Sequence, residues 1–215
     1  MDQEPEQSAG TNNFAIKAQS FIYKNYKLLI IVFTTVLLIL ISLFFYNEFL
    51  ENKKIKIADQ YNSLIIDLEK KNDDKAIIGL KKIINEKDKT YSPLAFYYLL
   101  ENDLISSKDE INIFFDLIIN DLNLNKEIKN LNIYKKGLFN SNYVSEEKLL
   151  NILKPILSSE SAWKSHAFYL LGEYFFSKGE KQKSKEFFIK IINMKISNLK
   201  IKQEAEKRIK RDFSE

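Results

Sequence analysis

Apolar and polar positions alternate with a helical period along most of this chain, but one stretch is apolar throughout. Residues 28–46 read LLIIVFTTVLLILISLFFY and carry no charged side chain. Nineteen helical residues at 1.5 Å rise each match the roughly 30 Å hydrocarbon core of a bilayer. The hydroxyls of Thr34, Thr35 and Ser42 can bond to carbonyls of the preceding turn. The pattern therefore predicts a transmembrane helix over residues 28–46.

Two other readings of this stretch are less favoured by the sequence. A core helix of a soluble protein usually carries a polar stripe, and this stretch has none. A cleaved signal peptide has a shorter apolar core followed by small residues. Here bulky residues follow, because the chain continues as Phe44-Phe45-Tyr46-Asn47-Glu48-Phe49. We expect an uncleaved anchor.

The number of lysines is the same on both sides of the predicted span. Three stand on each side within about 15 residues, the distance over which such charges orient a span: Lys17, Lys24 and Lys27 before it, and Lys53, Lys54 and Lys56 after it. The nearest charges after the span are Glu48 and Glu51. We therefore expect residues 1–27 to form a cytoplasmic N-terminal tail and residues 47–215 to lie outside, which is the periplasm in a Gram-negative cell.

After the span, the pattern indicates helical hairpins that recur about every 35 residues. Residues 76–85, 111–120 and 184–193 end alike (AIIGLKKIIN, INIFFDLIIN, SKEFFIKIIN), which aligns Leu80, Phe115 and Phe188. Residues 128–157 fill the longer gap with their own hairpin around a turn at residues 140–142. We predict an all-α fold: a transmembrane helix, then a tetratricopeptide-like α-solenoid of about four hairpins and a charged capping helix over residues 199–213.

The last hairpin resembles the tetratricopeptide repeat consensus most closely. Its expected packing residues are Leu171, Gly172, Phe175, Gly179, Ser184 and Phe188. The resemblance implies that small residues at 172 and 184 allow the two helices to approach, while the large ones fill the space between them. Gly179 falls in the turn, where a positive φ costs glycine little. The repeat's consensus proline is replaced by Ile196.

Composition gives no sign of catalysis. The chain has no cysteine and a single histidine, His166, and it lacks a glycine-rich phosphate loop or a metal-ligand cluster. We expect no enzyme activity, no cofactor and no metal. His166 is interpreted as a packing or surface residue. Trp163, Tyr97 and Tyr98 are the candidate partner-binding residues, with core or cap positions as the alternative.

The net charge of +4 is concentrated near the C-terminus. Residues 178–211 hold twelve Lys or Arg and four Asp or Glu. Such a stripe can bind nucleic acid, anionic lipid or an acidic protein, or can be a solvated helix face. We favour the solvated face and expect no nucleic acid partner.

The C-terminal quarter is similar to the YfgM-like ancillary subunits of the SecYEG translocon, which are single-pass membrane proteins with a tetratricopeptide-like domain. The similar residues, in the family's order, are 153–157, 162–164, Ala167, 170–172, Gly179, 187–188 and 203–206. Tyr23 and Tyr26 depart from the more usual Trp/Tyr pair before the span. The resemblance implies a non-catalytic inner-membrane scaffold whose partners are the translocon, periplasmic chaperones or exported chains. The alternative is a membrane-tethered adaptor or regulator that sequesters a protein partner, which requires the inverted topology.

Overall fold

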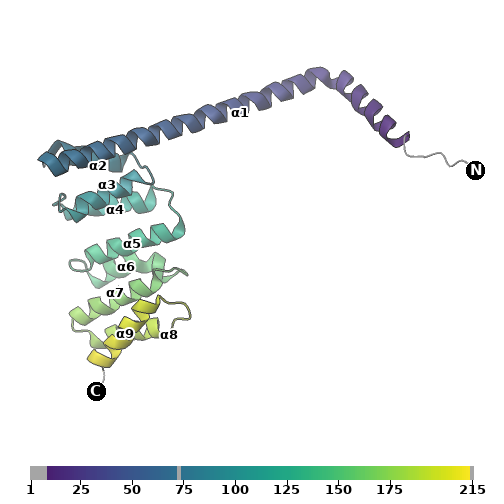
Figure 1. Ribbon diagram of the computed structural model, residues 1–215. Coiled ribbons are helices and arrows are strands. Elements are labelled where there is room, and N and C mark those ends of the chain that lie inside the picture. The colour runs from purple at the N-terminus through teal and green to yellow at the C-terminus, as the bar shows by residue number, and fades with distance from the viewer. Residues whose placement is uncertain (1–8, 72–73, 214–215) are drawn as a thin grey trace, which may run out of the picture. The chain divides into compact units, whose positions relative to one another are not determined.

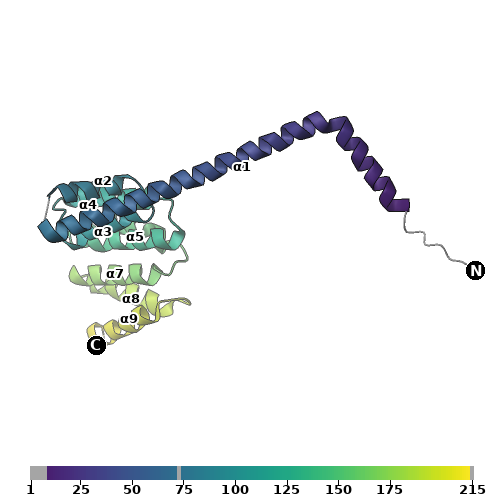
Figure 2. The same ribbon diagram turned by 45° about the horizontal axis from the view of Figure 1, so that its top comes forward.

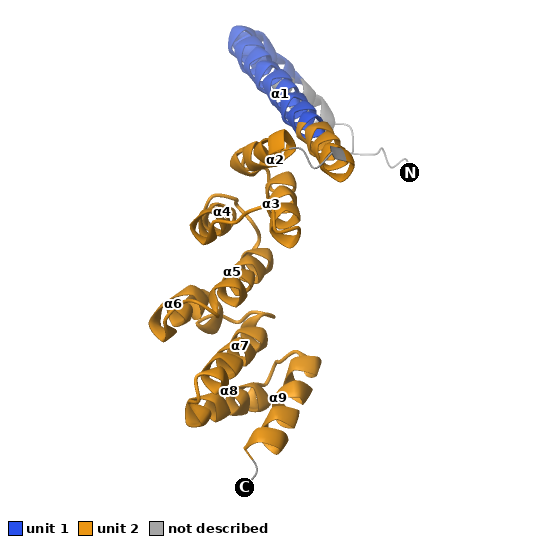
Figure 3. Ribbon diagram, turned by 90° about the vertical axis from the view of Figure 1, so that its left-hand side faces the viewer, with its two compact units in different colours: residues 1–56 blue, residues 57–215 orange. Residues whose placement is uncertain are grey.

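The computed structural model describes residues 9–71 and 74–213, and these residues form helices and no strand. The prediction of an all-helical chain is confirmed. The chain divides into two compact units, residues 1–56 and residues 57–215 (Figure 3). Residues 47–56, which the sequence analysis assigns to the helical domain, are exposed and fall in the first unit.

In the first unit the structure describes helix α1 as far as Lys56; the whole helix extends over Ala9–Lys71. Its backbone leaves helical geometry at Asn25 (φ −115°, ψ 15°), where the side-chain amide donates to the carbonyl of Phe21 at 3.0 Å. In the apolar stretch, Thr34 and Thr35 bond to carbonyls of the preceding turn as expected, at 2.9 and 2.8 Å. Among the described residues, α1 is the one helix long and apolar enough to cross a membrane, and its apolar stretch is fully exposed.

The second unit begins with the last turns of α1 and continues through eight shorter helices. These are α2 (Asp74–Asn85), α3 (Tyr91–Glu101), α4 (Lys108–Asn120), α5 (Lys126–Asn140), α6 (Glu146–Leu157), α7 (Lys164–Ser177), α8 (Lys181–Asn193) and α9 (Leu199–Asp212). They stack in chain order (Figures 1 and 2). The hairpin predicted over residues 128–157 is confirmed as α5 and α6. The connection between α1 and α2 includes residues 72–73, which lie outside the described residues.

One buried position recurs in each even-numbered helix. Leu80, Phe115, Leu153 and Phe188 are each at most 1% exposed. The intervals between them are 35, 38 and 35 residues. The position three residues later is always isoleucine (Ile83, Ile118, Ile156 and Ile191), and each is at most 3% exposed. The even-numbered helices therefore turn the same face to the core in every hairpin.

Glycine stands 16 residues before this position in the third and fourth hairpins. A Cβ added at Gly172 would lie 2.7 Å from Cε1 of Phe188, and one added at Gly137 would lie 2.6 Å from Cδ2 of Leu153. Ser184 adds a polar link to the fourth pair, because its buried hydroxyl donates to the carbonyl of Gly172 at 2.8 Å. The two helices of each pair therefore approach at equivalent places.

The interval of 38 residues comes from an extra turn at the start of α5. Gly137 is the twelfth residue of α5, whereas Gly172 is the ninth of α7. The added residues contact the loop between α6 and α7. Glu127 accepts from the hydroxyl of Ser161 at 2.9 Å and from the amide of Ala162 at 3.1 Å. The insertion thus links the third hairpin to the entrance of the fourth.

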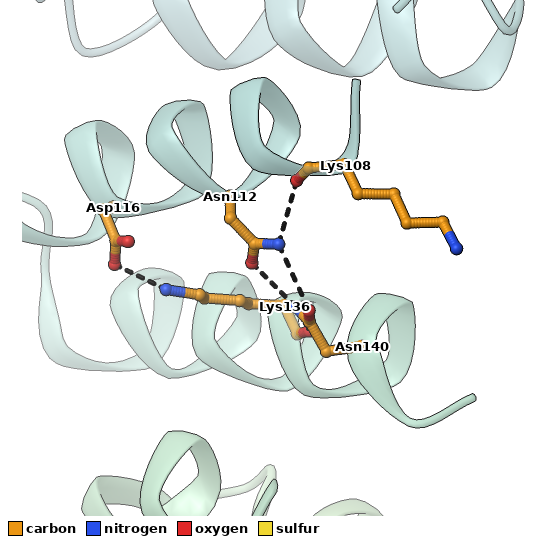
Figure 4. A network of polar contacts seen from close by, with 5 residues as sticks. All are labelled: Lys108, Asn112, Asp116, Lys136 and Asn140. Carbon is orange, nitrogen blue, oxygen red and sulfur yellow. Dashed lines mark hydrogen bonds and ion pairs between the residues drawn. The ribbon is translucent and has the colours of Figure 1, made fainter. Parts of the chain in front are cut away.

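A polar network joins α4 to α5 (Figure 4). Asn140, which is 2% exposed, donates its amide to Asn112 at 2.8 Å, and Asn112 donates back to Asn140 at 3.2 Å. Each amide also donates to a carbonyl one turn earlier in its own helix, those of Lys108 and Lys136. The Lys136 ammonium lies 2.6 Å from Asp116. Because the buried amides have partners, this network fixes the register of the two helices.

Candidate functional site

The two sides of the stack are built from alternate helices. Figure 3 shows α3 and α5 on one side and α4 and α6 on the other. Over residues 9–71 and 74–213, no group of three or more His, Cys, Asp or Glu is placed to hold a metal ion. The side chains of interest are instead half-buried aromatic and polar groups on the odd-numbered helices.

Tyr97 on α3 is the centre of the first group. Its hydroxyl donates to the side-chain oxygen of Asn132 on α5, and the Lys135 ammonium lies 3.6 Å from the centre of its ring. Burial, and secondarily the charge of Glu101, raise the pKa of Tyr97 well above its usual range. The phenol therefore stays neutral at any physiological pH and acts as a hydrogen-bond donor. Lys135 over the ring provides a cationic, partly exposed edge.

Trp163, at the entrance of α7, is the centre of the second group. Its indole stacks on the ring of Tyr134 from α5, with ring centres 5.7 Å apart and an angle of 23°. His166 completes the group, with its ring 4.9 Å from that of Trp163 and 5.7 Å from that of Tyr134. The three rings form one half-buried aromatic surface that bridges α5 and α7.

His166 is held in its neutral form within this surface. Burial lowers its pKa, and a hydrogen bond with the backbone of Ala162 opposes that effect in part. Its Nδ1 atom is buried and has no hydrogen-bond partner among the described residues. Burial likewise raises the pKa of Tyr134. The three rings are therefore uncharged at neutral pH.

Helix α9 covers the continuation of this side on α7. Arg208 lies 2.9 Å from Glu173, and its guanidinium stands 4.4 Å from the ring centre of Phe176. Phe213 at the end of α9 meets Phe176 edge to face, with ring centres 5.9 Å apart. The open part of the odd-numbered side is therefore α3, α5 and the first turn of α7.

The residues predicted from sequence fall into three places. Leu171, Phe175 and Phe188 are at most 1% exposed, and Ser184 is also fully buried. Gly179 follows α7 with φ +78°, a conformation that favours glycine. Trp163 and Tyr97 belong to the two groups above. Tyr98 does not join either group; it packs against the core on the side of Tyr61.

Sequence reasoning did not identify Tyr134, Asn132 or Lys135. One signal was available, because Tyr134 precedes Tyr169 by 35 residues, the repeat interval. Asn132 and Lys135 carried no such signal, since their role depends on α3 lying beside α5.

Comparisons with known proteins add no assignment. No protein-family model matches this chain, and no curated protein or solved structure matches it either.

Proposed function

We propose that this protein is a membrane-anchored scaffold whose helical unit is a tetratricopeptide-like solenoid that binds a protein partner on its odd-numbered helices. The observation that carries the proposal is the repeated buried register of α2, α4, α6 and α8. That register commits the same face of every even-numbered helix to the core. It leaves aromatic and polar groups of α3, α5 and α7 partly exposed on the other side.

The chemistry of this surface suits a protein ligand. Tyrosine and tryptophan provide large contact areas at low entropic cost and are enriched among the residues that dominate binding. Tyr97, Tyr134 and Trp163 stand on three successive odd-numbered helices, so an extended or helical segment lying across them would touch all three. Leu138, which is 49% exposed one turn after Tyr134, extends the apolar part of the surface.

The apolar stretch at residues 28–46 supports the anchoring part of the proposal. None of its side chains is buried within the described structure, and lipid would cover such an apolar surface. The resemblance to YfgM-like proteins extends the proposal to a place beside the SecYEG translocon, with residues 1–27 cytoplasmic and the helical unit in the periplasm. There it would associate with the translocon, periplasmic chaperones or exported chains.

Site-specific photo-crosslinking in living cells tests the proposal. A photoreactive amino acid replaces Leu138 on the proposed surface, and in a matched chain it replaces Ile113, which is 63% exposed on α4. We expect translocon subunits or periplasmic chaperones to be crosslinked from position 138 and not from position 113. Equal yields from both positions would reject the surface. Crosslinks from position 138 to cytoplasmic proteins alone would favour the membrane-tethered adaptor with inverted topology.

A further inference from the structure

The loop between α8 and α9, residues 194–198, carries an apolar side chain into solvent. Ile196 is 86% exposed, and Leu199, the first residue of α9, is 71% exposed. These are the two most exposed large apolar side chains in the described part of the second unit. Such exposure in a folded domain calls for a partner, because water disfavours it.

The exposure is built into a defined loop. The α8 helix ends at Asn193, and Met194 is extended (φ −64°, ψ 132°). At the other end, the Asn198 side chain accepts from the amide of Ile201 at 3.2 Å, which caps α9. The amide of Asn198 also donates to the buried hydroxyl of Ser165 at 3.3 Å. Ile196 is therefore presented from a loop that is fixed on both sides.

The loop and the segments on either side of it in the sequence carry charge of one sign. Residues 190–202 contain four lysines and no acidic residue. Lys195 and Lys200 flank the exposed apolar pair, and both are exposed. The loop also forms one wall of a cleft of about 480 Å³, to which Glu127 and Glu160 contribute from the other side. The carboxylate of Glu127 accepts from the hydroxyl of Ser161 and the amide of Ala162, so it is held against the α6–α7 loop.

We propose that this loop is a contact site for an anionic membrane surface. Ile196 and Leu199 enter the interfacial region, and the ammonium groups of Lys195 and Lys200 bind lipid phosphates. Aliphatic side chains beside lysines are the combination that such interfaces favour. One loop gives a weak interaction alone, but an anchor in the same chain raises its local concentration at the bilayer. The inference rests on the anchoring part of the proposed function and needs no protein partner.

The full chain can be labelled at a single introduced cysteine, because it has no cysteine of its own. Ile196→Cys is labelled with an environment-sensitive fluorophore, and the protein is reconstituted into vesicles of phosphatidylcholine alone or with added phosphatidylglycerol. Ile113→Cys is the matched control, since Ile113 is exposed but lies on α4. We expect emission at position 196 to be blue-shifted and several-fold brighter in the anionic vesicles, and emission at position 113 to be the same in both.

A second variant distinguishes a fluorescence change that depends on the lysine charges from one caused by burial of the label within the protein. Adding Lys195→Glu and Lys200→Glu to the labelled Ile196→Cys chain is expected to abolish the difference between the two vesicle types. Equal emission from position 196 in both vesicle types would overturn the proposal, as would a difference that survives the charge reversal. A response that appears only when an acidic protein is added would also overturn it. Failure of crosslinking at position 138 would not change any of these readings, so the two proposals fail independently.

Discussion

The third and fourth hairpins have the same register but hold it with different chemistry. Lys136 and Asn140 on α5 stand 35 residues before Leu171 and Phe175 on α7, so they occupy equivalent positions. In the fourth hairpin these positions are apolar, and the Phe175 ring stacks on that of Phe187 at 5.4 Å. In the third hairpin they are polar and reach across to α4 (Figure 4). The backbone arrangement thus tolerates either solution as long as each buried polar group has a partner.

The largest expected effect on stability comes from removing the apolar packing of the fourth hairpin. Phe175→Ala deletes a ring that is 1% exposed and stacked on Phe187. Such a truncation costs about 3–5 kcal/mol of unfolding free energy, because a cavity remains. Urea denaturation of the full chain in detergent, followed by circular dichroism, measures it. An effect below that of Asn140→Ala would contradict the view that this hairpin depends on apolar packing.

Damage to the polar contact between α4 and α5 is expected to reduce stability most when only one of its two amides is removed. Asn140→Leu leaves the half-buried Asn112 amide without its partner on α5, which costs about 1–3 kcal/mol. Asn112→Leu together with Asn140→Leu removes both groups and is expected to recover part of that loss. The same denaturation assay measures the single and double variants. Additive losses would show that the two amides do not act as a pair.

The two glycines sharpen the comparison further. Gly172→Ala brings a Cβ against the Phe188 ring, whereas Gly137→Ala brings one against a terminal methyl group of Leu153; both side chains are fully buried, but a methyl group shifts at less cost than a rigid ring. Overpacking typically costs about 1–3 kcal/mol, and alanine in a helix returns up to about 1 kcal/mol. We expect Gly172→Ala to be destabilising and Gly137→Ala to be close to neutral. Thermal denaturation of the two variants side by side decides the order, and a reversed order would refute the packing argument.

The smallest expected effect is the contribution of His166, at the junction of the third and fourth hairpins, to the pH dependence of stability. Burial lowers the folded-state pKa of His166 below its ordinary value near 6.5. The unfolded chain therefore binds the proton first, so stability is complete above pH of about 6.5 and decreases as the pH falls below it. We expect His166→Gln to show a shallower loss of stability on acidification than the natural chain. Parallel slopes in denaturation series at several pH values would contradict the burial of this imidazole.

The sequence predicted the helices well because apolar periodicity is a local property. Leu80, Phe115 and Phe188 could be aligned from their surroundings alone, and all three are buried. Leu153 was not placed in that alignment, because α6 ends in LKPIL and lacks the ending that residues 76–85, 111–120 and 184–193 share. In the same hairpin, the partners of Lys136 and Asn140 lie on α4, 20 and 28 residues earlier, and no local pattern reports such a pairing.

The candidate site was less accessible to sequence reasoning than the fold. Trp163 and Tyr97 were selected because they are large aromatic residues, but the sequence did not show that Tyr134 stacks on the one and Asn132 bonds to the other. The expected hydroxyl bond of Ser42 is also absent from the described part of α1, although Thr34 and Thr35 form theirs. Contacts between helices decide the site, and they depend on the three-dimensional packing.

The most direct test of the account is the topology of the chain in the membrane. One reporter that is active only in the periplasm and one that is active only in the cytoplasm are fused in turn after residue 215. The account predicts activity of the periplasmic reporter alone, because residues 28–46 span the membrane once and the helical unit follows. Activity of the cytoplasmic reporter alone would contradict it, and would place the helical unit and its aromatic surface where translocon and periplasmic partners are out of reach.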